Sequence, residues 1–147
     1  DNLHTDDIIY TSDVTVIKDD DYNPLPPDEV FDVDVITCAA PNLREKPDNA
    51  FNADYGKALT LSDEDLYDLH LKRAKKIMAV AASKGVETII LGAFGCGAFR
   101  NNPKVVAKAY KDAVEEFKFA FKAIEFAVYC PSTHTENYNA FLRAFKG

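Results

Sequence analysis

One stretch of the chain, residues 91–103 (LGAFGCGAFRNNP), has the composition of a ligand-binding loop. It contains three of the six glycines, Gly92, Gly95 and Gly97, and one of the three cysteines, Cys96. Glycines permit positive φ angles and let a ligand approach the backbone closely. Successive amide N–H groups can then form a concave anion site, aided by the positive end of a following helix. The stretch predicts a phosphate or pyrophosphate site, although a tight turn alone would also use glycines.

The order of these glycines disfavours the common phosphate-binding motifs. The pattern is G-x-x-G-x-G rather than G-x-G-x-x-G, and no acidic residue follows at the distance of about 20 residues that a dinucleotide-binding fold uses. The chain has no Gly-Lys-Ser/Thr sequence, so it has no P-loop. Phe94 and Phe99 flank the glycines, and aromatic faces beside a phosphate site suit a ribose or a base.

Strands and helices alternate around this stretch. Continuous apolar runs predict buried strands at residues 33–38, 86–91 and 124–130, and two short strands are expected at residues 8–10 and 14–18. Such alternation with helices predicts an α/β fold with a parallel sheet, in one domain that covers residues 1–147. Ligands of parallel α/β sheets bind beyond the carboxyl ends of the strands, which is where the glycine stretch lies.

Three helices are expected from their start and stop signals. Ser62 is a good N-cap for a helix that ends at Gly85, and Asn102 caps a second helix whose first residue is a proline. Thr133 and Glu136 fit a capping box for the last helix. His70, in the middle of the first helix, is interpreted as a half-exposed side chain with no special role.

Composition limits the classes of function. The 147 residues carry a net charge of −7, which repels nucleic-acid phosphates, so no backbone contact with DNA or RNA is expected. No apolar stretch reaches the length of about 20 residues that spans a bilayer, and no signal peptide is visible. The three cysteines are widely spaced, which favours a reducing, cytoplasmic compartment. No cofactor is expected.

Alternative readings of the cysteines and acidic residues remain open at this point. Cys38, Cys96 and Cys130 could form a zinc site with His134, but their spacing is not that of zinc ligands, and small buried side chains are the simpler interpretation. Cys96 precedes a helix, where a lowered pKa could make it a nucleophile. A role in shaping the loop is favoured for Cys96. The Asp19–Asp21 run is interpreted as a solvated turn rather than a metal site.

Several segments resemble those of microbial-type poly(ADP-ribose) glycohydrolases, a macrodomain-like family. GAFGCGAFRNNP resembles the second phosphate-binding loop of that family. IIYTSDVTVIKDDD resembles its "IYSPDVPVFRDD" segment, and DVITCAAPNLR resembles its "VDVITAPAPN" strand. The resemblance extends to the helix, strand, loop and helix of residues 71–110. The matching segments cover most of the chain in the right order.

The resemblance implies a three-layer α/β/α macrodomain-like fold with a mixed sheet that binds ADP-ribose or an ADP-ribosylated protein. Carried over by position, the diphosphate and the distal ribose would contact Gly95, Cys96, Gly97, Ala98 and Phe99. Asn102 would shape the loop. Tyr138 or Phe141 would lie near the adenine.

One departure from the family concerns catalysis. Its Gly-Gly-Gly and Gln-Glu-Glu motifs precede the "IYSPDVPVF" segment, and neither motif occurs in these 147 residues. The chain therefore looks like the carboxyl-terminal half of a longer enzyme, with a sheet incomplete on its amino-terminal side. No catalytic residue is assigned in it, and the carboxylates nearest to the expected site are Glu136 and Asp54. The expected partners include the missing half or a second copy, and the alternative is a binding module without hydrolysis.

Overall fold

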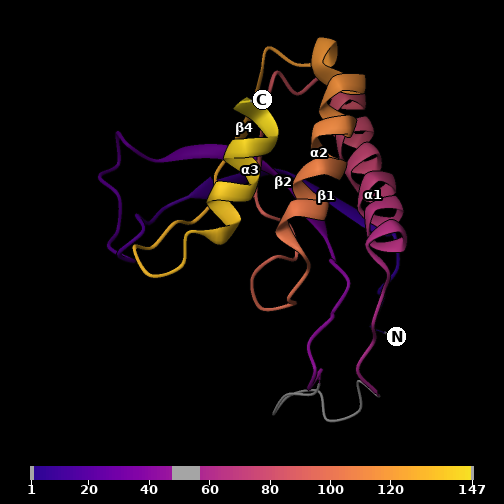
Figure 1. Cartoon of the computed structure of the whole chain (residues 1–147). Coiled ribbons are helices and arrows are strands. Elements are labelled where there is room, and N and C mark those ends of the chain that lie inside the picture. Colours follow the sequence, from indigo (N-terminus) through magenta and orange to yellow (C-terminus); the bar gives the residue numbers. More distant parts are fainter. Residues whose placement is uncertain (1, 48–56, 147) are drawn as a thin grey trace. The chain divides into compact units, whose positions relative to one another are not determined.

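The computed structural model describes residues 2–47 and 57–146 (Figure 1). Its elements are β1 (Ile8–Val16), β2 (Phe31–Cys38), α1 (Asp63–Ser83), β3 (Thr88–Leu91), α2 (Pro103–Phe117), the 3₁₀-helix η1 (Lys118–Ala120), β4 (Ala123–Phe126) and α3 (Glu136–Lys146). The expected mixed α/β class is confirmed. Two compact units are formed, residues 7–38, called the hairpin unit, and the remainder, called the helical unit. None of the helices in the described ranges is long and apolar enough to cross a membrane.

The hairpin unit is an antiparallel ribbon of β1 and β2. The two short strands expected at residues 8–10 and 14–18 are one strand that ends at Val16, and its pairing with β2 is irregular between Thr11 and Val14. The expectation that residues 33–38 are buried is wrong, because Val33 and Val35 are each 37% exposed, and Phe31 just before them is 53% exposed. The described hairpin unit has no helix to cover these side chains.

Of the three strands that the sequence places in a parallel sheet, β3 and β4 form a parallel pair in the helical unit, whereas residues 33–38 pair antiparallel with β1 instead. β3 pairs with β4 from Thr88 opposite Ala123 to Leu91 opposite Phe126. Burial alternates along β3, since Ile89 and Leu91 are buried while Ile90 is 66% exposed, so the prediction of a wholly buried strand is wrong for this position. β4 ends at Phe126, well before the predicted end at residue 130. In the helical unit α2 packs against both α1 and α3.

The ends of α1 and α2 follow the sequence signals. Ser62 Oγ accepts a hydrogen bond from the Asp65 amide at 3.0 Å, and Gly85 ends α1 with a φ of +74°. Asn102 Oδ1 accepts from the Lys104 amide at 3.1 Å, with Pro103 as the first residue of α2. These caps fix where α2 begins, and therefore where the glycine stretch must end.

The start of α3 differs from the prediction. The helix begins at Glu136, and the Thr135 carbonyl accepts the first helical hydrogen bond, from the Asn139 amide at 2.9 Å. Thr135 therefore precedes the helix directly, and the expected capping box of Thr133 and Glu136 is wrong. Thr133 instead contacts its neighbour, with its Oγ1 2.9 Å from His134 Nδ1.

Candidate functional site

The glycine loop, residues 92–102, joins the end of β3 to the start of α2. Gly95 has a φ of +75°, a conformation that side chains rarely adopt. A Cβ atom there would lie 2.8 Å from Ala40 Cβ and 2.9 Å from Asn101 Nδ2. Gly95 is therefore required by its backbone conformation and by the close packing around it.

Asn101 holds the loop together from the inside. It is 2% exposed, and its Nδ2 donates to the carbonyl oxygens of Pro41 at 2.8 Å, Gly95 at 2.9 Å and Phe99 at 3.2 Å. Its Oδ1 lies 2.8 Å from Nε2 of His70 on α1. One buried amide thus gathers three backbone carbonyls and fastens the loop to a helix.

The backbone amides of the loop fall into two groups. The N–H groups of Phe94, Cys96, Arg100 and Asn101 donate to carbonyls within the loop. Among the described residues, no acceptor lies within hydrogen-bond distance of the other seven amides of the loop, which are those of Gly92, Ala93, Gly95, Gly97, Ala98, Phe99 and Asn102. The longest consecutive run among them is Gly97, Ala98 and Phe99. Backbone amides left in this way can accept an anion between them.

Gly97 and Ala98 form the open part of the loop. Both are exposed, and a Cβ atom placed on Gly97 would meet no atom within 4 Å. The φ of Gly97 is not positive, so its backbone tolerates a side chain. The protein itself therefore gives no reason for glycine at this position, whereas a ligand held against the backbone would.

Cys96 is not activated as a nucleophile. Its side chain is buried, and burial raises the pKa of its thiol to about 12. The thiol points back to the Phe94 carbonyl, with Sγ 3.6 Å from that oxygen. The alternative of a reactive cysteine with a lowered pKa is therefore wrong, because desolvation outweighs the effect of the helix start.

Phe99 contacts two side chains that the sequence did not single out. Its ring centroid is 5.7 Å from that of His4, and Arg44 Cζ is 5.8 Å from its centre. Arg44 is held there because Nε donates to Asn42 Oδ1 at 3.1 Å. A cation and an aromatic ring thus flank the end of the loop that carries the open amides.

Arg73 fastens the start of the chain beside the same loop. Its guanidinium is almost wholly buried and donates to Asp6 Oδ1 at 2.9 Å and to the carbonyls of Leu3, His4 and Ala39. The hydrogen bond from Lys72, followed by that from Arg73, lowers the pKa of the Asp6 carboxyl. This network positions His4, and through it the contact with Phe99.

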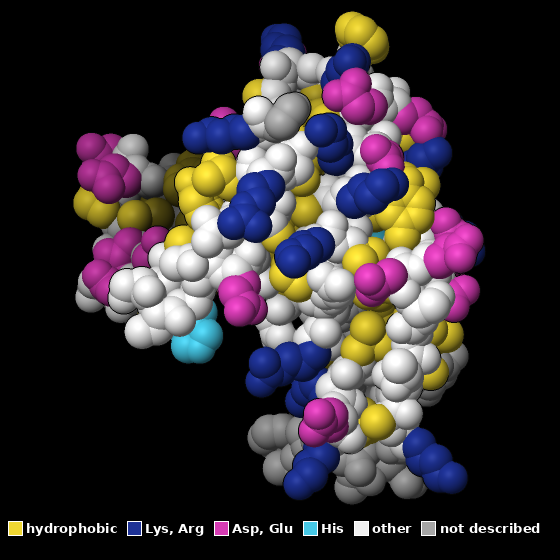
Figure 2. All heavy atoms as spheres, viewed as in Figure 1, with side chains coloured by type: hydrophobic (Ala, Val, Ile, Leu, Met, Phe, Trp, Pro, Cys, Tyr) yellow, Lys and Arg dark blue, Asp and Glu magenta, His cyan; other side chains and the backbone are white. Residues whose placement is uncertain are grey.

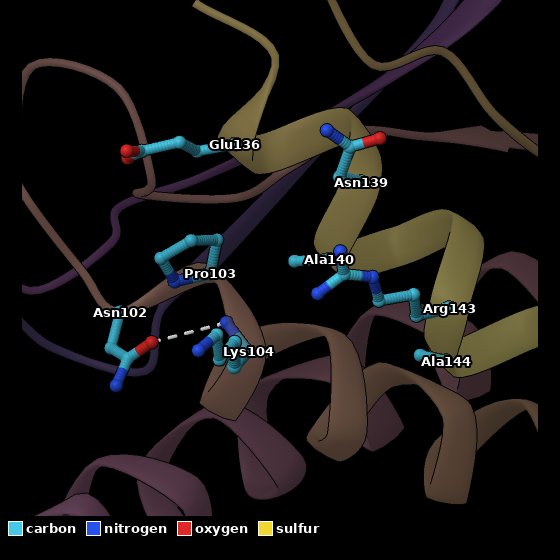
Figure 3. Close-up of a pocket in the computed structure, with 8 residues that line it drawn as sticks. All are labelled: Asn102, Pro103, Lys104, Glu136, Asn139, Ala140, Arg143 and Ala144. Carbon is cyan, nitrogen blue, oxygen red and sulfur yellow. Dashed lines mark hydrogen bonds between the residues drawn. The ribbon is translucent and has the colours of Figure 1, made fainter.

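A cleft of about 710 Å³ opens between the start of α2 and one face of α3. Figure 3 shows the Arg143 guanidinium extending from α3 toward the start of α2, where Lys104 lies. The cleft shares Asn102 with the glycine loop, and its remaining lining is Pro103, Glu136, Asn139, Ala140 and Ala144. Figure 2 shows Lys and Arg side chains gathered over α2 and α3, despite the net charge of −7.

The two residues expected near an adenine lie on α3, in different environments. Tyr138 is 41% exposed, whereas Phe141 is 3% exposed and packs on Phe126 with ring centroids 5.3 Å apart. Their expected roles stay predictions. The other expected contact residues lie together in the glycine loop, where Asn102 caps α2.

Within residues 2–47 and 57–146, the carboxylates do not gather at the loop. Among the described residues, the carboxylate recorded as bonded to residues 92–102 is that of Asp63, whose Oδ1 accepts from Asn102 Nδ2 at 3.3 Å. Glu136 lines the cleft, and Asp54 lies outside the described residues. In the described ranges no group of three or more His, Cys, Asp or Glu side chains could hold a metal ion.

Sequence reasoning missed the buried polar residues of the site. His70 is 0% exposed, so its interpretation as a half-exposed side chain is wrong. Burial, together with the nearby Arg73, lowers its pKa, against the hydrogen bond with Asn101. The doubled Asn101-Asn102 before a proline was the available signal, because one asparagine suffices to cap the helix and the other is left for the loop.

Solved structures match this chain, whereas no protein-family profile and no curated protein does. Poly(ADP-ribose) glycohydrolase from Deinococcus radiodurans, solved with ADP-ribose, is 31% identical with a TM-score of 0.77, over 99% of this chain and 54% of that one. The enzyme from Thermomonospora curvata is 29% identical with a TM-score of 0.79, over 99% of this chain and 49% of that one. This chain is a structural relative of the bacterial poly(ADP-ribose) glycohydrolases.

The resemblance to poly(ADP-ribose) glycohydrolases that the sequence indicated is thereby confirmed. The Deinococcus enzyme has also been solved in its apo form, which matches with a TM-score of 0.77 at 31% identity. The chain spans about half the length of these glycohydrolases. Its likeness to them therefore concerns a part of the enzyme.

Proposed function

We propose that this chain forms the ADP-ribose-binding part of a poly(ADP-ribose) glycohydrolase-type enzyme. The observation that carries the proposal is the run of amides at Gly97, Ala98 and Phe99, for which no acceptor is recorded in the described chain. The diphosphate would accept hydrogen bonds from them, as anions do at backbone nests and helix starts. Gly95 and Cys96 would complete the loop around it, and the ring of Phe99 would lie beside the distal ribose.

The rest of the nucleotide would extend toward α3. The cleft supports this direction, because Lys104 and Arg143 place two cations beside the first turn of α2. Tyr138 would meet the adenine from the exposed side of α3, and Phe141 would support that surface from the core. Local positive charge of this kind lets an acidic protein attract an anionic ligand.

The two units would belong to one three-layer α/β/α macrodomain-like domain, whose mixed sheet is completed by strands that these residues do not supply. The chemical step is assigned to a segment outside this chain, since stabilising an oxocarbenium-like transition state requires a carboxylate at the ribose. None of the described carboxylates is recorded in contact with the open amides. The alternative is a module that binds ADP-ribose without taking part in hydrolysis. The two hypotheses differ only in whether a catalytic segment acts together with this chain.

Gly97→Val is the sharpest test, because the space around Gly97 separates binding from folding. The valine side chain would occupy the ligand's place while meeting no protein atom near its Cβ. We expect ADP-ribose affinity, measured by calorimetry, to fall about tenfold or more, equivalent to about 1.4 kcal/mol or more. Ala120→Val, which adds methyl groups at an exposed position in η1, is the matched control and should bind as the parent does.

Two results would contradict the proposal. Equal affinity in Gly97→Val and the parent chain would remove the open amides from the site, and absence of any ADP-ribose binding would remove the function. The same preparations, incubated with an ADP-ribosylated protein, should release no ADP-ribose. Measurable release would return the search for the catalytic acid to Glu136 and Asp54.

A further inference from the structure

Asn101 and His70 form a buried pair that the binding of a diphosphate does not by itself explain. Both are almost fully buried, at 2% and 0% exposure, although each has polar atoms that water would otherwise solvate. Burying such groups is costly unless they are hydrogen-bonded. Asn101 meets this requirement through four contacts, and three of them are carbonyls of the loop and of the segment behind it.

The orientation of Asn101 fixes the state of His70. Because the amide nitrogen must face the three carbonyls, the amide oxygen faces His70 and accepts a hydrogen bond from its Nε2–H group. Nε2 of His70 therefore carries hydrogen, and the neutral ring leaves Nδ1 as an acceptor. Nδ1 is buried and has no hydrogen-bond partner among the described residues.

A second proton on His70 would be placed at that Nδ1. The surroundings do not favour it, because Arg73 lies three residues further along α1 and already carries a positive charge, which Asp6 balances. The loop residues that contact His70 are Asn101 and Phe94, and the ring centroids of His70 and Phe94 lie 5.9 Å apart. The Phe94 ring in turn contacts Tyr110 of α2. Arg73 is the charged group of the described chain recorded as acting on His70.

We propose that Asn101, held by His70, keeps the glycine loop in its ligand-binding conformation, and that protonation of His70 releases the loop. This inference rests on the proposed function for the identity of the ligand, but the loop's opening is a property of the free chain. Asn101 and His70 act as positioning residues. We call the observed conformation of the loop closed. In it Asn101 Nδ2 donates to carbonyls, so it leaves the amides of Gly97, Ala98 and Phe99 available to an anion.

The pH dependence has a definite sign. A neutral, buried His70 takes up a proton more readily once the loop opens, so acid favours the open state. Opening should increase as pH falls below about 6.5, the ordinary pKa of histidine, by up to about tenfold per pH unit until the closed state is protonated too. Above that pH the opening equilibrium should not change.

Hydrogen exchange of the free chain tests this without any ligand. The amides of Cys96, Arg100 and Asn101, which are hydrogen-bonded in the loop, should lose protection between pH 6.5 and 5.5 by up to about tenfold. His70→Gln keeps an N–H donor of similar reach and cannot titrate, so its protection factors should stay constant over the same range. Identical pH profiles in the parent chain and His70→Gln would overturn the proposal.

ADP-ribose calorimetry at pH 7.5 supplies the second readout. Asn101→Asp keeps the shape but replaces the donor, and should weaken binding about tenfold or more. Tyr67→Phe removes a 2.6 Å bond from α1 to Asp112 on α2, far along the chain from the loop, and should bind as the parent does. A folded Asn101→Asp with parental affinity would overturn the proposal. If the parent itself does not bind ADP-ribose, the proposed function fails, and hydrogen exchange alone decides the positioning claim.

Discussion

Two turns of this protein are each organised by a single Asp or Asn side chain. In one turn that side chain accepts hydrogen bonds from backbone amides, and in the other it donates hydrogen bonds to backbone carbonyls. In the hairpin unit, Asp19 Oδ1 accepts hydrogen bonds from the amides of Asp21 at 3.0 Å and Asn23 at 2.8 Å. In the helical unit, Asn101 donates to three carbonyls. Asp19 is exposed, whereas Asn101 is buried.

The direction of these bonds decides what each turn offers to a ligand. A carboxylate that accepts hydrogen bonds from backbone N–H groups occupies the donors that could otherwise bind an anion, and it adds a negative charge of its own. A side-chain amide that donates to carbonyls occupies no backbone N–H group with its nitrogen, and it adds no charge. The glycine loop can therefore receive a diphosphate, while the acidic turn, in a chain of net charge −7, repels one.

The largest effect is expected where the buried turn depends on a glycine. Gly95→Ala forces a side chain into a φ of +75° and to within 2.9 Å of Asn101 Nδ2, so we expect a loss of unfolding free energy of about 2 kcal/mol or more. Urea unfolding measures it. Gly97→Ala is the matched control, since its Cβ meets no atom within 4 Å, and should change stability by less than about 0.5 kcal/mol. Equal losses of unfolding free energy in Gly95→Ala and Gly97→Ala would contradict the claim that the packing of Asn101 around position 95 requires a glycine.

The smallest effect is expected in the exposed turn. Asp19→Ala should leave the unfolding midpoint and the ADP-ribose affinity unchanged, and should only speed hydrogen exchange at the amides of Asp21 and Asn23. These amide bonds, led by that from Asn23, lower the pKa of the Asp19 carboxyl. Their contribution is therefore present above about pH 3.8 and is lost as pH falls through the lower value of the folded turn. A marked drop in affinity would remove the contrast between the turns.

Local signals were sufficient to predict most of the helical unit. Ser62, Gly85 and Asn102 mark helix ends through bonds to their own neighbours, so the sequence contains everything that these caps need. A tight turn between β3 and α2 was predicted for a similar reason, since Gly95, whose φ is +75°, lies in a segment rich in glycine. The parallel pairing of β3 and β4 followed from the helix between them.

Partners distant in the chain could not be predicted from the sequence. His70 meets Asn101 across 31 residues, and Asn101 reaches Pro41 across 60, so neither residue stands out in its own segment. The exposure of β2 was missed because a run of apolar residues indicates burial, but it does not indicate which segment would cover the strand. Thr135 was passed over as a helix start because Thr133 fits the capping pattern better by spacing alone.

Amide chemical shifts during a titration with ADP-ribose test most directly whether the open amides bind the diphosphate. We expect the resonances of Gly97, Ala98 and Phe99 to shift saturably with ADP-ribose and to stay in place with adenosine, which lacks the phosphates. The amides of Asp21 and Asn23, already held by Asp19, serve as the internal reference and should not move. Saturable binding that leaves Gly97, Ala98 and Phe99 unshifted, or that adenosine reproduces, would contradict the assignment of the glycine loop.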